Sequence, residues 1–238
     1  MITTSRGPER ADIAIAFHGI GTPPPWVDDA ERRYWCDEAR YVELLDALLV
    51  RATASGRRLA ITFDDGNQSD IERALPPLLA RGACGEFFVC TARIGTAGYL
   101  SAESLRALHA AGMVIGSHGA RHVDWTTCDD AALAAEVHAP LAQLGELLGC
   151  VVDRIAIPFG AYDRRVVGEL RRSAARVVYS SDEDLPQAAA LLTPRFSVTD
   201  DWTVAHVEAM FGRRAFSLAT ARRRAIQWLK RTLPARAR

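Results

Sequence analysis

Two adjacent carboxylates, Asp64 and Asp65, stand where hydrolytic chemistry could begin. They follow the short run Ile61-Thr62-Phe63 and precede Gly66. Successive side chains of an extended chain diverge, so one carboxylate can bind a cation while its neighbour accepts a proton from a water molecule. Taken alone, an Asp-Asp-Gly run is more often a turn or a helix N-cap. Its meaning therefore depends on what else the chain brings to it.

Two histidines, His118 and His122, are spaced four residues apart. This spacing can place two imidazoles on the same side of a helical turn, where both reach one metal ion. Alone the pattern is weak, since most such pairs are surface or core histidines. Two histidines, one carboxylate and a water in an open position are a common ligand set for hydrolytic Zn²⁺. The combination predicts one divalent metal ion, with zinc favoured and cobalt or nickel as alternatives.

The elements that must position these residues alternate along the chain. Short apolar, β-branched runs are separated by longer helical patterns, which is typical of βα units that build a mostly parallel sheet. Strands are predicted at 13–17, 59–63, 86–89, 113–116, 154–157, 177–179 and 196–198. Helices are predicted at 37–54, 101–111 and 127–148, the last with a kink or break at Pro140.

About seven such repeats without a linker predict one α/β domain over residues 1–212, a distorted or incomplete (β/α) barrel of about seven strands. No G-x-G-x-x-G follows the first strand, which disfavours an open dinucleotide-binding sheet. Polar residues follow several predicted strands directly: His18, the Asp pair, His118 and the segment around Phe159. The carboxyl ends of parallel barrel strands converge on one face, so these residues should meet.

Three segments resemble the first three motifs of the polysaccharide deacetylase group, also called the NodB-homology domain or carbohydrate esterase family four. They are Ile61-Thr62-Phe63-Asp64-Asp65-Gly66, Ser117-His118-Gly119-Ala120-Arg121-His122 and Pro158-Phe159-Gly160, in the right order. The resemblance implies a distorted (β/α) barrel and a metal-dependent hydrolase that removes an N-acetyl group from an amino sugar or glycan precursor. It implies a metal ion held by Asp65, His118 and His122, with Asp64 as general base. A backbone N–H near Phe159 would stabilise the oxyanion.

The chain departs from the family pattern in two places. Family members often carry Arg two residues before the motif proline, where this chain has Ala156. Arg195 is a candidate replacement, and an ordinary surface arginine is an equal alternative. The Leu-x-His motif that supplies a general acid is also missing, because residues 191–198 contain no histidine.

His18 is the predicted general acid. Of the four histidines outside the metal pair, it alone stands at the end of a predicted strand on the catalytic face. The nitrogen of a cleaved amide must be protonated to leave, and imidazole suits this task near neutral pH. The alternatives are a further metal ligand or a structural histidine.

Trp125 could pack over the metal site or line a sugar subsite, since aromatic faces suit pyranose rings, or it could be a packing residue.

Composition indicates the class of protein, its expected partners and its expected location. Apolar residues make up 49% and charged residues 24%, typical of a globular protein, and the five cysteines lack metal or redox spacing. Basic and acidic residues both total 29, so nucleic acid is not an expected partner. Without an export signal or an apolar stretch of about 18 residues, a cytoplasmic location is expected. The substrate would then be a lipid-linked or nucleotide-linked amino sugar.

Two further hypotheses stay open. A non-sugar amidohydrolase of the allantoinase or imidase type would use the same fold, whereas a catalytically inactive binding module is disfavoured because all four central residues are present.

The segment 213–238 is basic, and its charged residues are interleaved with apolar ones. It is predicted as a C-terminal helix or tail with weak peripheral contact to anionic lipid at the inner membrane face. A packed final helix with a frayed end is the alternative.

Overall fold

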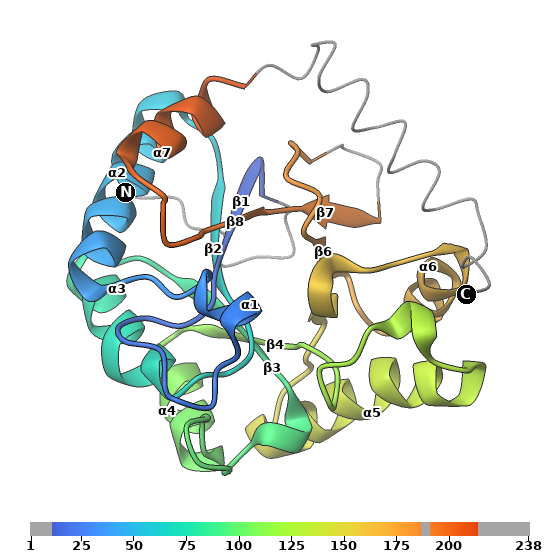
Figure 1. Cartoon of the computed structure of the whole chain (residues 1–238). Helices are drawn as coiled ribbons and strands as arrows, with labels where there is room; N and C mark the ends of the chain where they lie inside the picture. The colour runs from blue at the N-terminus through green and yellow to red at the C-terminus, as the bar shows by residue number, and fades with distance from the viewer. Residues whose placement is uncertain (1–10, 187–190, 214–238) are drawn as a thin grey trace.

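The strands of this protein form one curved parallel sheet. The structure, a computed structural model, describes residues 11–186 and 191–213. The strand order is β7-β6-β5-β4-β3-β2-β1-β8, and every neighbouring pair is parallel (Figure 1). The strands are β1 (Ile13–Phe17), β2 (Leu59–Phe63), β3 (Gly85–Val89), β4 (Val114–Ser117), β5 (Arg154–Ala156), β6 (Val177–Ser180), β7 (Leu192–Pro194) and β8 (Phe196–Ser197).

The last two strands close this sheet into a barrel. β7 pairs with β6 and β8 pairs with β1, although only Arg195 separates β7 from β8 in the chain. One extended segment therefore crosses from one edge of the sheet to the other, so that β7 and β8 share a single place around the barrel. The predicted (β/α) barrel of about seven strands is confirmed. The short β7 was not predicted.

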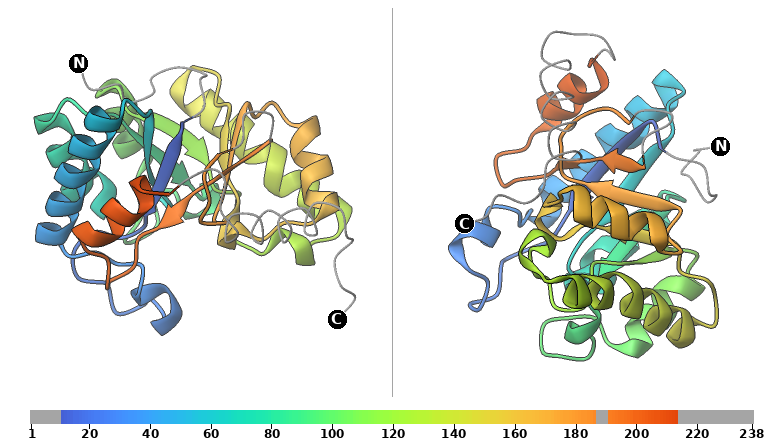
Figure 2. Two further views of the ribbon diagram at one scale, coloured as in Figure 1. Left: turned by 90° about the horizontal axis from the view of Figure 1, so that it is seen from above. Right: turned by 90° about the vertical axis from the view of Figure 1, so that its right-hand side faces the viewer.

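Helices cover the outside of the barrel, as Figures 1 and 2 show. They are α1 (Asp29–Arg32), α2 (Glu38–Ser55), α3 (Leu75–Ala80), α4 (Ala102–Ala110), α5 (Asp130–Leu148), α6 (Arg164–Arg172) and α7 (Val204–Phe211). A π-helical turn, Asp70–Ala74, leads into α3, and α7 lies beside α2 (Figure 2). Among the described residues, no helix combines the length and the apolar character needed to cross a bilayer.

Local signals explain where the long helices begin and end. Asp37 caps α2 by accepting a hydrogen bond from the backbone of Arg40, and Gly56 ends the helix at φ 66°. The expected α5 starts three residues later than predicted, after an Asp129 cap, and runs through Pro140 as one helix. The helix is therefore not broken there, and the alternative of a kink stays a prediction. Pro140 is buried, and it removes one backbone hydrogen bond from the helix.

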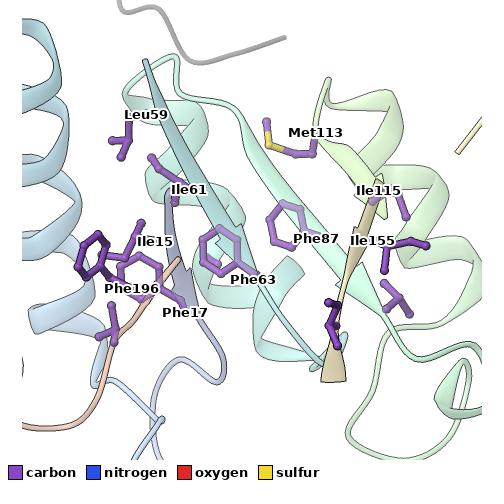
Figure 3. Close-up of a cluster of buried hydrophobic side chains, with 14 of the residues drawn as sticks. Ile15, Phe17, Leu59, Ile61, Phe63, Phe87, Met113, Ile115, Ile155 and Phe196 are labelled. Carbon is purple, nitrogen blue, oxygen red and sulfur yellow. The ribbon is translucent and has the colours of Figure 1, made fainter. Parts of the chain in front are cut away.

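Side chains of the strands divide into two layers. Those pointing outward, such as Ile15, Ile61 and Phe87, pack beneath the helices in the main core, part of which Figure 3 shows. Those pointing inward form a second cluster of alanines with Phe88 and Tyr179. Because both faces of the strands are buried, they read as continuous apolar runs rather than alternating ones. Small interior residues leave room in the barrel for a few large polar side chains.

The predicted basic segment 213–238 lies outside the described residues, apart from Arg213. The proposed division of the chain at residue 212 therefore stays a prediction.

Candidate active site

The Asp pair is divided by a turn at the end of β2. The backbone N–H of Asp64 donates to the carbonyl of Phe17 at 2.9 Å, which continues the strand pairing. Asp65 then adopts φ 77° and Gly66 φ 71°. Positive φ is uncommon for an aspartate and is often found at functional sites. Both carboxylates line one pocket, but the turn gives them different surroundings: Asp64 is 2% exposed, whereas Asp65 is half-buried.

Asp65, His118 and His122 converge on a site that fits a metal ion. One potential ligand atom from each lies within 4.8 Å of the others, and Asp65 Oδ1 is 3.2 Å from His122 Nε2 and 3.7 Å from His118 Nε2. Within the described part of the chain, buried Asp65 Oδ1 accepts no hydrogen bond. A buried carboxylate oxygen with no donor beside two imidazole nitrogens is the arrangement that a divalent cation would satisfy.

The surroundings of the two histidines suit metal binding. His118 Nδ1 donates to the carbonyl of Ala156 at 2.8 Å, which orients Nε2 toward Asp65. Burial lowers the pKa of His122 to about 4, although Asp65 opposes the shift. Neutral imidazole is the metal-binding form, so the lowered pKa of His122 suits the role that the sequence predicted.

An irregular loop, rather than a helical turn, brings the two histidines together. Residues 118–122 follow β4 without helical structure, and His122 has φ 56°. Glu136 of α5 is 1% exposed and accepts hydrogen bonds from the backbone N–H groups of Ala120 (2.7 Å) and Arg121 (3.3 Å). It also accepts one from Arg121 Nε at 2.8 Å. Glu136 thus ties the metal-binding loop to a helix.

Arg195 forms a bidentate ion pair with Asp64. Its two terminal nitrogens donate to Asp64 Oδ1 and Oδ2 at 2.7 and 2.6 Å, and one also donates to Thr62 Oγ1 at 2.8 Å. The guanidinium is fully buried, with its carbon 5.6 Å from the Phe88 ring centroid and 5.4 Å from that of Tyr179. The alternative of a surface arginine is wrong. Arg195 reaches the first Asp from the crossing between β7 and β8.

The ion pair controls the ionisation of Asp64. Burial alone would raise the pKa of this carboxyl, but the charge of Arg195 and the hydrogen bonds from Arg195 outweigh it. The pKa of Asp64 therefore lies well below its usual range. Asp64 is therefore ionised throughout the neutral range, which is the form that a general base requires.

His18 faces the same pocket from the end of β1. Its ring centroid is 4.9 Å from that of Tyr34, and its buried Nδ1 has no hydrogen-bond partner among the described residues. Burial lowers the pKa of His18 below its usual value, although the charges of Asp65 and Asp64 oppose the shift. The group of potential metal ligands does not include His18. Trp35 packs so closely on the next residue, Gly19, that a Cβ there would lie 2.1 Å from its ring.

The pocket encloses about 170 Å³ beside these residues. Phe159 forms part of its rim: it is 60% exposed, has φ 56°, and its ring lies 4.4 Å from that of His122. The segment between β1 and α2 contributes a wall that spacing did not predict, including Glu31, Tyr34 and Trp35.

Trp125 does not line the pocket. It is fully buried in the main core, packed against Gly119 beneath the metal-binding loop. The prediction that it could line a sugar subsite is wrong, and the packing alternative is correct. A buried side chain cannot present its face to a ligand.

We predict that Glu136→Leu weakens binding of Zn²⁺ by about 10- to 100-fold, the range expected when a group that orients metal ligands is lost. Two backbone N–H groups would lose their acceptor, and the loop would no longer hold His118 and His122 together. Glu136→Gln, which keeps an acceptor oxygen, should recover part of the loss. Competition titration with a chromophoric chelator measures the affinity. Exposed Glu146 on the same helix gives the control, Glu146→Leu; equal affinities for both leucine variants would contradict this role.

Several solved structures share the fold of this chain. Among solved structures, the chain resembles a Streptococcus pyogenes deacetylase, PplD, in complex with acetate (TM-score 0.74, 17% identity, 86% of this chain and 99% of that one). It also resembles a polysaccharide deacetylase from Bacillus cereus (0.73, 16%, 85% and 69%) and IcaB from Ammonifex degensii (0.67, 21%, 85% and 97%). At these identities the likeness shows a shared fold. No curated protein matches the chain.

The family model for polysaccharide deacetylase matches residues 51–178, more than half of the chain. The matched region contains the Asp pair, both histidines of the metal-binding loop and the turn at Phe159. The predicted family and the predicted deacetylase activity are confirmed. This chain belongs to the polysaccharide deacetylase family, hydrolases that remove acetyl groups from glycans.

Proposed function

We propose that this deacetylase cleaves the N-acetyl amide of an amino sugar or glycan precursor with a single zinc ion held by Asp65, His118 and His122. The observation that carries the proposal is the unpartnered Oδ1 of Asp65 between two imidazoles, next to an Asp64 that Arg195 keeps in place. One carboxylate is thereby open to a cation, and the other is held in its ionised form beside it.

The division of labour follows from these surroundings. When bound, the metal ion would polarise the acyl carbonyl and lower the pKa of a water molecule. Asp64, ionised and locked by two hydrogen bonds, accepts the proton of the attacking water. The backbone N–H of Phe159 donates no hydrogen bond to another described residue. It is therefore available to stabilise the oxyanion of the tetrahedral intermediate.

His18 is proposed as the group that protonates the leaving amine. It lines the pocket but stands outside the potential metal ligands, and its Nδ1 has no competing partner in the described part of the chain. These observations favour the acid over the alternative of a further ligand. After proton transfer, the products are acetate and a free amino group on the sugar.

The cytoplasmic location, the lipid or nucleotide carrier of the sugar, and the contact of segment 213–238 with anionic lipid stay predictions from the sequence.

The roles of the two aspartates can be separated by substitution. Asp65→Ala should lose bound metal and acetate release together, because it removes a proposed ligand. Asp64→Asn should keep its metal and lose most turnover, because an amide cannot accept the proton. Metal analysis by mass spectrometry and an acetate-release assay on N-acetylated amino sugars measure both. The reverse pattern, with metal lost in Asp64→Asn and retained in Asp65→Ala, would exchange the roles.

The ion pair predicts a pH effect. Asp64 must be ionised to act as base, so activity is lost as the pH falls through its pKa, which Arg195 holds low despite burial. In Arg195→Gln, burial is no longer opposed by this charge, the pKa of Asp64 rises, and the acid limb of kcat/KM moves to higher pH. Arg195→Lys, which keeps a charge, should shift it less. Circular dichroism confirms folding of each variant, and an unmoved acid limb in folded Arg195→Gln would refute this role.

Loss of the proposed acid should depend on the leaving group. His18→Ala should bind metal normally and lose on the order of 10²-fold or more in turnover on an amide. An activated ester, whose leaving group needs less protonation, should show a smaller loss. Steady-state kinetics on both substrates decide the point. Equal losses on amide and ester, or loss of the metal, would count against His18 as the acid.

A further inference from the structure

Arg93 is a cation of the catalytic pocket to which no step of the proposed reaction assigns a task. It ends a short 3-10 turn, Thr91–Arg93, that directly follows β3. The turn is anchored, because the Arg93 N–H donates to the carbonyl of Cys90 at 2.9 Å and the Arg93 carbonyl accepts from Thr96 Oγ1 at 2.7 Å. Its side chain is 24% exposed, so the guanidinium sits within the pocket wall.

The guanidinium is stacked over Tyr99, whose ring centroid is 4.9 Å from its central carbon. Tyr99 is fixed in turn by its bridge to Asn67 and by the bond from the N–H of Leu100 to the carbonyl of Gly66 at 2.9 Å. Stacking uses the flat face of a guanidinium and leaves its N–H edge available for hydrogen bonds. Arg93 is thus held in a defined orientation beside the metal-binding loop.

The N–H groups of this arginine donate no hydrogen bond in the described part of the chain. Arg93 forms one long ion pair there, with Asp65 Oδ1 at 3.6 Å. Partly buried donors without acceptors are unfavourable, and five donors in a planar fork match a carboxylate or a phosphate.

The acidic residues around Arg93 would not neutralise its charge once the metal ion is bound. Asp65 is a proposed metal ligand, so its negative charge is shared with a cation once the ion binds. The remaining acidic residue of this wall, Glu31, forms no ion pair with Arg93 among the described residues. In the loaded pocket, Arg93 would be a cation without a committed counterion.

We propose that Arg93 binds an anionic group of the substrate, a phosphate or a carboxylate, so that this enzyme prefers acidic sugar derivatives to neutral ones. The inference rests on the proposed function, because it concerns the same pocket and the same reaction. Arg93 is thus a substrate-binding residue, and Glu31 is the carboxylate that opposes the anion. The two therefore have opposite effects on substrate preference.

The test compares three N-acetylated sugars: N-acetylglucosamine, its 1-phosphate, and the derivative with a carboxylate at C6. Dissociation constants are measured by calorimetry with zinc-loaded Asp64→Asn protein, which should bind these sugars with little turnover. Values of kcat/KM are measured with the parent enzyme. The phosphate and the carboxylate are separate arms, and whichever binds more tightly identifies the anion.

An anionic sugar should bind at least about ten-fold more tightly than the neutral one, as expected for a charge-assisted pair. Arg93→Gln should remove most of this preference, Arg93→Lys part of it, and Glu31→Gln should increase it. Equal weakening of neutral and anionic sugars by Arg93→Gln, or no preference in the parent protein, would overturn the inference. Acetate release from a neutral sugar without preference would leave the proposed function intact. No acetate release from any N-acetylated sugar would refute that function, while the binding arm would still test Arg93.

Discussion

A buried ion pair between Arg195 and Asp64 connects the closure of the barrel to its chemistry. Arg195 is the single residue between β7, which pairs with β6, and β8, which pairs with β1. Its side chain points into the barrel and binds both oxygens of Asp64. Removing one partner of such a pair leaves an uncompensated buried charge, which typically costs about 3–5 kcal/mol. The segment that closes the barrel therefore also carries the residue that fixes Asp64.

The barrel interior is built to accept this pair. Tyr179 packs against the Arg195 guanidinium and uses its hydroxyl to donate to Glu86 Oε1 at 3.2 Å. Glu86 also accepts from Arg154 at 2.6 Å, so a second ion pair lies within the barrel. Burial raises the pKa of Glu86, although Arg154 opposes the shift. Polar side chains thus extend from the active site into the barrel, in space that its small strand residues leave free.

Much of the site could be predicted because topology places the ends of parallel strands together. Asp64, Asp65, His118 and His18 each directly follow a strand, and the structure brings all four to one pocket. The partner of Asp64 was harder to identify, because Arg195 is 131 residues away and lies between two very short strands. Strand propensity did not predict β7, because this strand has only three residues, one of them a proline, and is defined by its pairing with β6.

Other residues were missed because their role depends on tertiary packing. Glu136 occupies the buried face of α5 between Leu133 and Val137, where a charged residue is unexpected. That mismatch was the available signal, but the loop that it binds could not be inferred from the helix alone. Arg93 gave no periodic signal at all. Trp125 follows the metal-binding loop closely in sequence, yet the chain folds it beneath that loop.

In the proposed mechanism, Asp65 binds the metal while Arg195 keeps Asp64 out of the coordination sphere of the ion. Anomalous X-ray diffraction at the zinc edge, from crystals of the zinc-loaded protein, can test this arrangement. We expect one peak about 2.0–2.2 Å from a carboxylate oxygen of Asp65 and from Nε2 of His118 and His122. Asp64 should remain paired with Arg195. A peak coordinated by Asp64 or by His18, or an Asp64 that has left Arg195 to reach the ion, would refute the proposed roles.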